Sequence, residues 1–269
     1  MTPTTRTASA TISKLEEIVD RHLSEVDRTR SVAAEREQAM AVGDTRGFEA
    51  AIRDDESLSV IAEIKRRSPS QGDLNTDLVP SDLATSYAEG GAACLSVLTD
   101  HHYFGGSLRD LVEARQACRM PVLRKDFTVD VLDVYDARRT ADAVLLIVGA
   151  RDSAETRDLF QAAADVQVDA LVEVHDESDL EEALTLGATL VGVNQRNLRE
   201  MRLIEPDQYW AVKMAPHLPD HVVSVAMSGV RSADDARRLR NAGYDAILVG
   251  ETLVRSPDPA AMVKALRVP

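Results

Sequence analysis

The chain is poor in cysteine and in aromatic residues, and it contains no long apolar run. Only 2 of its 269 residues are cysteine, and 4% are aromatic. Two cysteines, Cys94 and Cys118, do not make a disulfide framework in a chain of this length, which favours a reducing compartment. No segment approaches the roughly 18 apolar residues of a membrane helix, and the N-terminus has no apolar core of the signal-peptide type. We therefore expect a cytoplasmic protein that does not associate with a membrane.

Positive charge is also scarce, because the chain has 31 basic and 45 acidic residues and a formal net charge of −14. This balance disfavours binding to nucleic acid or to an anionic membrane, which needs a basic surface. It is compatible with a small anionic ligand, since one local group of lysines and backbone N–H groups can hold a phosphate. Metal-ligand spacing is missing too, so we expect no metal ion. The histidines that lack such spacing are His22, His101, His102, His217 and His221.

Eight short apolar runs, each followed by a helical pattern, occupy the chain from residue 59 onward. Most runs show no clean alternation, which is typical of parallel strands buried on both faces. The Gly-x-Gly-x-x-Gly turn of many doubly wound sheets is absent after the first run. The sequence therefore predicts an α/β fold of the (β/α)8 TIM-barrel type. The expected strands are Ser59–Lys65, Cys94–Thr99, Val122–Lys125, Ala143–Val148, Ala170–His175, Leu190–Asn194, Val222–Ala226 and Ala246–Val249.

Helix signals separate these strands, and no low-complexity linker divides the chain. We expect helices at Pro80–Glu89, Ser107–Ala117, Val131–Thr140, Ser153–Asp165, Ser178–Leu186 and Ser232–Ala242. Ser153, Ser178 and Ser232 are the expected N-caps, and Gly90, Gly187 and Gly243 the expected ends. The prediction is one domain over residues 1–269.

Residues 1–50 of that domain are predicted to form an N-terminal helical extension. Thr11 or Ser13 is the expected cap of a first helix, whose apolar residues recur close to a 3.6-residue period. These apolar residues are Ile12, Leu15, Ile18, Val19, Leu23 and Val26. The charged stretch Asp27–Arg46 fits either a second helix or a mobile segment.

Several predicted strands end in two functional residues spaced i, i+2. The pairs are Glu63/Lys65, Lys125/Phe127, Glu173/His175 and Asn194/Arg196. Residues two apart on a strand point to the same side. Because the carboxyl ends of barrel strands meet at the active face, we expect these side chains to converge on one cavity.

The charged members of these pairs suit acid–base chemistry, although each also has a structural interpretation. Glu63 and Lys65 could be an ion pair at the top of the core, and Glu173 could only neutralise Lys125. Two lysines in one cavity nevertheless point to anionic substrate groups, tuned acidity, or both. Glu173 would be partly desolvated and could serve as a general acid or base. We interpret His175 as non-catalytic.

A phosphate site is expected beside the same cavity. Glycine turns follow the last two predicted strands, at Ser228-Gly229 and at Gly250-Glu251. In barrels these loops commonly cradle a phosphate through backbone N–H groups. Ser68, in the loop after the first strand, adds a polar group at the same mouth.

Longer motifs in the chain resemble one known family. AEIKRRSPSQG, LSVLTDHHYFGGS, PVLRKDF, LVEVHDESDLEEAL, VGVNQRNL and AILVGETLV are similar, in the same order, to segments of indole-3-glycerol-phosphate synthases. The likeness covers nearly the whole chain. It implies a (β/α)8 fold and a carboxy-lyase of tryptophan biosynthesis that needs no cofactor. The implied reaction closes 1-(2-carboxyphenylamino)-1-deoxyribulose 5-phosphate into an indole with loss of carbon dioxide and water.

The resemblance also implies roles for individual residues. The catalytic residues of the family match Lys125, Lys65, Glu173, Glu63 and Asn194 of this chain. Substrate binding falls on Ser68, Phe127 and Arg196, and Phe104 is a further candidate for packing against the anthranilate ring. The phosphate-binding set falls on Ser228, Gly229, Gly250 and Glu251.

One position departs from the family pattern. Met227 stands before the Ser-Gly of the seventh strand, where the family usually has glutamate. A thioether neither accepts a strong hydrogen bond nor balances a lysine charge, so the activity is expected to be reduced. A divergent paralogue acting on a modified anthranilate-derived ribulose phosphate, and a non-catalytic sugar-phosphate-binding barrel, are the alternatives. We expect a monomer or a weak oligomer.

Overall fold

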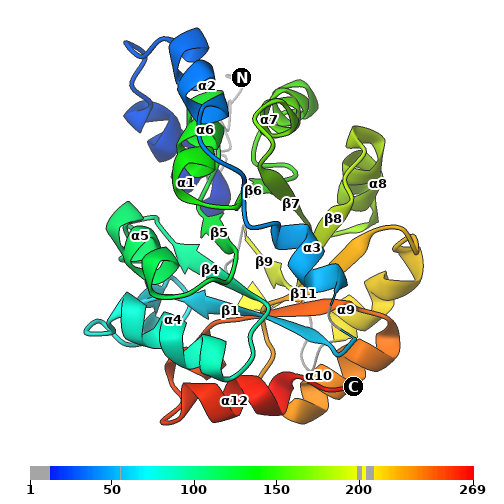
Figure 1. The fold of residues 1–269 in the computed structure, drawn as a ribbon. Coiled ribbons are helices and arrows are strands. Elements are labelled where there is room, and N and C mark those ends of the chain that lie inside the picture. Colours follow the sequence, from blue (N-terminus) through cyan, green and yellow to red (C-terminus); the bar gives the residue numbers. More distant parts are fainter. Residues whose placement is uncertain (1–12, 55, 199–201, 204–208) are drawn as a thin grey trace, which may run out of the picture.

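The computed structural model describes residues 13–54, 56–198, 202–203 and 209–269 (Figure 1). Eight parallel strands form a closed barrel in the order β1-β12-β11-β8-β7-β6-β5-β4. Nearly all of their residues are buried, because one face of each strand lines the barrel interior and the other contacts the helices. The predicted (β/α)8 barrel is confirmed. The strands are β1 Ser59–Ile64, β4 Cys94–Leu98, β5 Val122–Lys125, β6 Ala143–Ile147, β7 Asp169–Val174, β8 Leu190–Asn194, β11 Val223–Met227 and β12 Ala246–Val249.

Helices surround the strands, as Figure 1 shows. They are α4 Pro80–Glu89, α5 Leu108–Ala117, α6 Val131–Thr140, α7 Ser153–Asp165, α8 Glu177–Leu186, α9 Tyr209–Met214, η1 Ala215–His217, α10 Ala233–Ala242, α11 Glu251–Val254 and α12 Pro259–Leu266. None of the described helices is long and apolar enough to cross a lipid bilayer. Two antiparallel ribbons lie in the loops after β1 and β8. Their strands are β2 Arg67–Ser68 with β3 Gly72–Asp73, and β9 Arg196–Asn197 with β10 Arg202–Leu203.

The helix caps correct two sequence predictions. The side chain of Ser232 accepts a hydrogen bond from Asp235 N and caps α10 as expected. Ser153 and Ser178, in contrast, lie inside their helices, because the preceding Asp152 and Asp176 act as the N-caps. An aspartate carboxylate accepts hydrogen bonds from the first free backbone amides as well as a serine hydroxyl does. Each helix therefore begins after the aspartate, which comes earlier in the chain than the serine. α4 ends at Gly90, and Gly187 and Gly243 end α8 and α10 in the left-handed conformation.

The strand limits differ from the predictions by one residue at several ends. The difference that matters for the site is β11, which runs Val223–Met227 rather than Val222–Ala226. Val222 N donates to Pro219 O within a turn, and the ladder starts with Val223 opposite Leu190. Met227 is therefore the last residue of the strand, opposite Asn194.

From residue 13 onward, where the structure describes it, the N-terminal extension forms the helices α1 Lys14–Glu25, α2 Val32–Met40 and α3 Phe48–Arg53. Ser13 caps α1 in a capping box with Glu16, which confirms one of the two expected caps; Thr11 and Ile12 lie outside the described residues. The segment Asp27–Arg46 contains α2, so the helical interpretation is confirmed.

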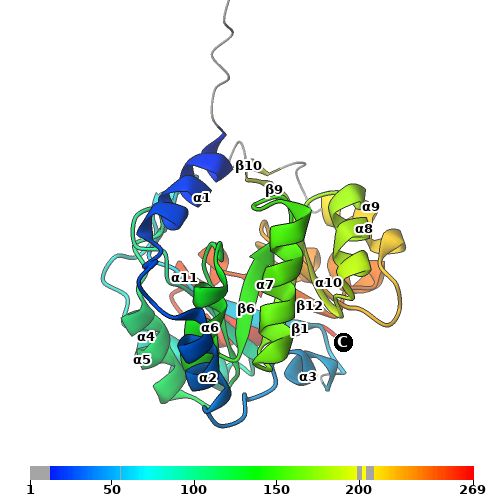
Figure 2. The same cartoon turned by 90° about the horizontal axis from the view of Figure 1, so that it is seen from above.

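The extension runs from one end of the barrel to the other. His22 of α1 contacts Asp100, which follows β4, so α1 lies at the carboxyl ends of the strands. α2 packs along α6. Glu49 N of α3 donates to the side chain of Asp169, the first residue of β7, so α3 closes the amino ends. Figure 2 shows α1 and α3 at opposite ends of the molecule.

Candidate active site

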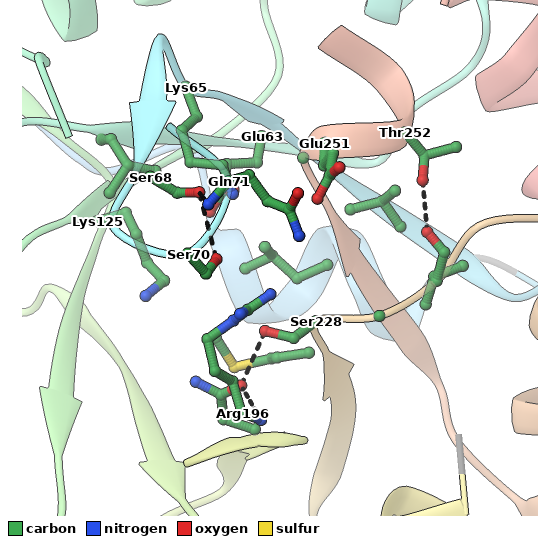
Figure 3. Close-up of a pocket in the computed structure, with 18 of the residues that line it drawn as sticks. Glu63, Lys65, Ser68, Ser70, Gln71, Lys125, Arg196, Ser228, Glu251 and Thr252 are labelled. Carbon is green, nitrogen blue, oxygen red and sulfur yellow. Dashed lines mark hydrogen bonds and ion pairs between the residues drawn. The ribbon is translucent and has the colours of Figure 1, made fainter. Parts of the chain in front are cut away.

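A cavity of about 380 Å³ opens at the carboxyl ends of the barrel strands. Residues from six loops and strand ends line it, and the labelled side chains in Figure 3 point toward one another around this space. Its volume falls in the range of small-molecule sites. Most of the residues predicted from the sequence line it, namely Glu63, Lys65, Ser68, Phe104, Lys125, Asn194, Arg196, Ser228, Gly229, Gly250 and Glu251. We call this cavity the crater.

One wall of the crater is a close ion pair from the end of β1. Lys65 Nζ lies 2.6 Å from Glu63 Oε2, and both side chains are largely buried. Gly250, at the start of α11, makes room for the pair. A Cβ atom on Gly250 would lie 2.2 Å from Glu63 Oε2 and 3.0 Å from Lys65 Nζ. A side chain at this position would therefore displace the Glu63–Lys65 pair from its present geometry.

A second lysine–carboxylate pair joins β5 to β7. Lys125 Nζ lies 3.4 Å from Glu173 Oε2, and Asn194 Nδ2 donates to Glu173 Oε1 at 2.8 Å. Glu173 is fully buried below the crater and does not line it. Burial alone would raise the pKa of Glu173, but Lys125, His175 and Asn194 outweigh burial and hold it well below its usual range. Glu173 is therefore a carboxylate at neutral pH.

Asn194 links this pair to the loop after β11. Its Oδ1 accepts hydrogen bonds from Ser228 Oγ at 2.9 Å and from Arg196 N at 3.0 Å. Ser228 has φ of 72°, a left-handed conformation that non-glycine residues rarely adopt, and Gly229 follows with φ of 80°. Such backbone geometry is common where a loop is shaped for a function. Here it brings the Ser228 hydroxyl back onto Asn194.

Three arginines are among the residues that line the crater. They are Arg196, Arg231 and Arg255, and Arg255 Nε lies 3.6 Å from Glu251 Oε1. Burial lowers the pKa of Arg196, while the nearby charges of Glu251 and Glu63 act in the opposite direction. A partly desolvated guanidinium remains charged, and it favours an anionic ligand. The expected phosphate loops, Ser228–Gly229 and Gly250–Glu251, also line the crater.

Aromatic side chains form another part of the mouth. The rings of Phe104 and Phe127 lie with their centroids 6.3 Å apart, and His22 of α1 lies 5.6 Å from Phe127. Phe104 lines the crater, whereas Phe127 is buried behind it and does not. The structure thus places Phe104 in the position where a ligand ring can be contacted directly.

Asp126 accepts hydrogen bonds from Thr99 Oγ1 and Arg124 Nη2. Together with His22 and Asp100 it forms a group whose potential ligand atoms lie within 4.8 Å of one another. The sequence spacing gave no sign of this group. Hydrogen bonds account for its atoms, since His22 Nε2 contacts Asp100 Oδ2 at 3.1 Å and Asp100 Oδ1 accepts from Tyr103 N. We assign it no metal.

Two features of the site were not predicted from the sequence. Arg231 and Arg255 follow the strands by several residues, so the i, i+2 pattern did not include them. His175 belongs to an i, i+2 pair and was interpreted as non-catalytic, so its contact with Glu173 was not predicted. In the structure its Nε2 lies 3.4 Å from Glu173 Oε1.

The fold and the crater define a class of protein: a (β/α)8-barrel with a cavity built from lysine–carboxylate pairs beside a cationic rim. Two solved structures share this fold at low sequence identity. 3-Hexulose-6-phosphate synthase has a TM-score of 0.61 at 19% identity, covering 78% of this chain and 98% of that one. Thiamine phosphate pyrophosphorylase from Pyrococcus furiosus has a TM-score of 0.56 at 18% identity, covering 78% and 93%.

Sequence comparison identifies the family. The model of indole-3-glycerol phosphate synthase matches residues 15–266. Relatives called indole-3-glycerol phosphate synthase occur in Nocardioides sp., 48% identical over 87% of this chain and 92% of the relative, and in Polaromonas sp., 41% identical over 95% and 97%. Indole-3-glycerol phosphate synthase 2 of Streptomyces coelicolor is 44% identical over 90% and 94%. The chain belongs to the indole-3-glycerol phosphate synthase family.

Proposed function

We propose that this protein is a carboxy-lyase that converts 1-(2-carboxyphenylamino)-1-deoxyribulose 5-phosphate to indole-3-glycerol phosphate, without a cofactor. One observation carries the proposal within this family: two lysines, each paired with a carboxylate, converge on one cavity with a cationic rim. A mere sugar-phosphate binder has no need for this full set of acid and base groups.

The reaction needs an acid twice and a base once. The aryl carbon attacks C2 of the ribulose chain while an ammonium group protonates the ketose oxygen. Carbon dioxide then leaves, and the electron pair of the broken bond restores the aromatic ring. The new hydroxyl leaves as water after a second protonation, and a base removes a proton to complete the indole. Lys65 and Lys125 provide the acids, and Glu173, which is buried behind Lys125, acts as the base once the substrate engages Lys125 and frees its Oε2.

The other predicted residues bind or orient. Glu63 holds Lys65 through the 2.6 Å ion pair, and Asn194 orients Glu173 through its amide. Ser68 and Arg196 offer polar contacts to the substrate, and Phe104, backed by Phe127, offers an apolar wall for the anthranilate ring. The phosphate would bind at the backbone of Ser228, Gly229, Gly250 and Glu251, with Arg231 and Arg255 nearby.

The direct test is turnover of the carboxyphenylamino substrate, followed by the fluorescence of the indole product. We expect the wild-type protein to turn over and Lys125→Ala to lose about 10²- to 10⁴-fold in kcat, the usual contribution of a general acid. Lys264→Ala, which removes an exposed lysine of α12, is the matched control and should keep full activity. Substrate binding without turnover in the wild type would instead indicate a non-catalytic barrel.

A second candidate, a paralogue with an altered substrate, rests on Met227. This apolar side chain lines the crater and is almost fully buried beside Asn194. It gives a wall suited to an extra apolar substituent on the anthranilate ring. Turnover that occurs only with a substituted anthranilate derivative would support this candidate over the ordinary reaction.

A further inference from the structure

Glu173 is reached from three sides by groups of different chemistry. Its Oε2 faces Lys125, whose Nζ lies 3.4 Å away and lines the crater. Its Oε1 is shared by two groups: Asn194 Nδ2 at 2.8 Å and His175 Nε2 at 3.4 Å. The two oxygens of the carboxylate therefore have separate surroundings, one toward the crater lysine and one toward fixed groups in the wall.

The imidazole of His175 is held in place by its neighbours. Asp179, in the first turn of α8, accepts a hydrogen bond from His175 N at 2.8 Å and lies 3.3 Å from ring Nδ1 with the same oxygen. Trp210 Nε1 of α9 donates to the His175 carbonyl at 2.9 Å. With Nδ1 beside Asp179, the buried Nε2 lies 3.4 Å from Glu173 Oε1, which is an ion-pair contact without a hydrogen bond.

The charged groups around the ring favour its protonated form. Glu173 faces it from β7 and Asp179 from α8, Lys125 of β5 lies across Glu173, and the neutral Trp210 of α9 contacts the His175 carbonyl. Burial alone would lower the pKa of His175, but the two carboxylates raise it to about 9.

We propose that His175 is a positioning residue for the reaction: held by Asp179, it fixes Oε1 of Glu173 as a cationic partner and leaves Oε2 as the working oxygen. This inference rests on the proposed function of Glu173 as the base. When a substrate engages Lys125, Glu173 loses one of its two cationic neighbours. His175 and Asn194 then keep the carboxylate oriented, as a third group orients the base in other acid–base assemblies.

A purely structural role makes a different prediction. Asp179 could hold the loop between β7 and α8 through the backbone N–H of His175 alone, and the ring would then be irrelevant. Asp179→Asn separates the two roles, because an amide oxygen still accepts from His175 N but carries no charge. His175→Gln removes the ring charge and keeps a polar donor. His217→Gln is the matched control, since His217 is a half-exposed histidine paired with Glu177 of α8.

The experiment combines imidazole nitrogen NMR on the free protein with kinetics from pH 6 to 9. We expect His175 to titrate near pH 9 in the wild type and at least about one unit lower in Asp179→Asn. We expect His175→Gln to lose about tenfold or more in kcat at all pH values, with KM within about threefold. Asp179→Asn should match the wild type at pH 6 and fall toward His175→Gln by pH 8.5. His217→Gln should behave as the wild type.

The outcomes separate this inference from the proposed function. His175 titrating near its ordinary value of about 6.5 would overturn the inference. So would an Asp179→Asn variant whose loss of kcat is the same at every pH, because that result indicates a structural role. A wild-type protein without turnover would overturn the proposed function, and the titrations of His175 in wild type and Asp179→Asn would still decide whether the charged pair exists.

Discussion

Single residues in the crater are constrained by close approaches between facing strands. Gly250 admits the Glu63–Lys65 pair, and Gly192 admits the side chain of Met227. A Cβ atom on Gly192 would lie 2.4 Å from Met227 Sδ. Met227 therefore fills the space above Gly192, beside Asn194 in the ladder. This is the position where a charged side chain would reach the polar groups of the crater, and a thioether contributes only packing there.

The substitution Met227→Glu tests what that position does. A carboxylate there would accept charge-assisted hydrogen bonds from the cationic groups of the crater, each worth about 1.5–3 kcal/mol. Expressed wholly in the transition state, this gain corresponds to about 10- to 150-fold in kcat. We expect steady-state kinetics on the ordinary substrate to show an increase in that range. Met227→Gln is the uncharged control and should gain little.

A fall in kcat in Met227→Glu would mean that the position has been adapted to a different substituent on the substrate. The same variant would then lose turnover on a substituted anthranilate derivative.

At the scale of elements, a partly buried histidine holds helix α1 against the carboxyl ends of the barrel strands. His22 contacts Asp100 at 3.1 Å and lies 3.8 Å from Asp126. Burial alone would lower the pKa of His22, but the hydrogen bond to Asp100 and the charges of Asp126 and Asp100 raise it above its ordinary value. Phe127 packs against the same ring, so the helix and the aromatic wall of the crater are held together.

This contact predicts that the stability of α1 depends on pH. A histidine whose pKa is raised by folding stabilises fully below about pH 6.5, its ordinary value, and the stabilisation is lost as pH rises through the raised pKa. We expect the amides of α1 in the wild type to lose hydrogen-exchange protection, corrected for intrinsic rates, between pH 6 and pH 9.

In His22→Gln the protection of α1 should be lower at pH 6 by about tenfold, from one charged hydrogen bond. The difference from the wild type should shrink by pH 9. The amides of α7 serve as the internal control. Equal protection in the two proteins at pH 6 would show that the ion pair contributes nothing to the docking of α1.

At the scale of the whole molecule, the surface is acidic and carries few exposed large apolar side chains. In the described part of the chain these are Val32 and Met40 at the two ends of α2, Val42 just after it, Val79 before α4 and Leu108 at the start of α5. Scattered apolar residues are normal on a soluble monomer, and a stable dimer needs a contiguous patch. The formal charge of −14 also opposes self-association at low ionic strength.

We expect light scattering after size-exclusion chromatography to give the monomer mass of 29.3 kDa at micromolar concentration. Raising the salt concentration screens the surface charge and provides the control. A dimer at low salt would contradict the prediction and would point to an interface built from the apolar residues of α2.

Much of the barrel could be predicted from the sequence, because strand and helix signals depend on neighbouring residues. Apolar runs of four to six residues placed β5, β8 and β12 at their observed limits, and helical patterns placed α4, α6 and α7. Of the residues in the i, i+2 pairs, Glu63, Lys65, Lys125, Asn194 and Arg196 line the crater as predicted, since a side-chain period of two and a parallel barrel leave them one common end. Phe127, Glu173 and His175 do not line it.

The sequence by itself determined the barrel, its family and most of the groups that line the crater, because these follow from local patterning and from motifs in a fixed order. Only the tertiary structure decided how the groups pair. Glu173 meets Lys125, Asn194 and His175 across three strands, and Gly250 meets the Glu63–Lys65 pair from the far end of the chain. Those contacts depend on strand register and loop closure, which distant parts of the chain set together.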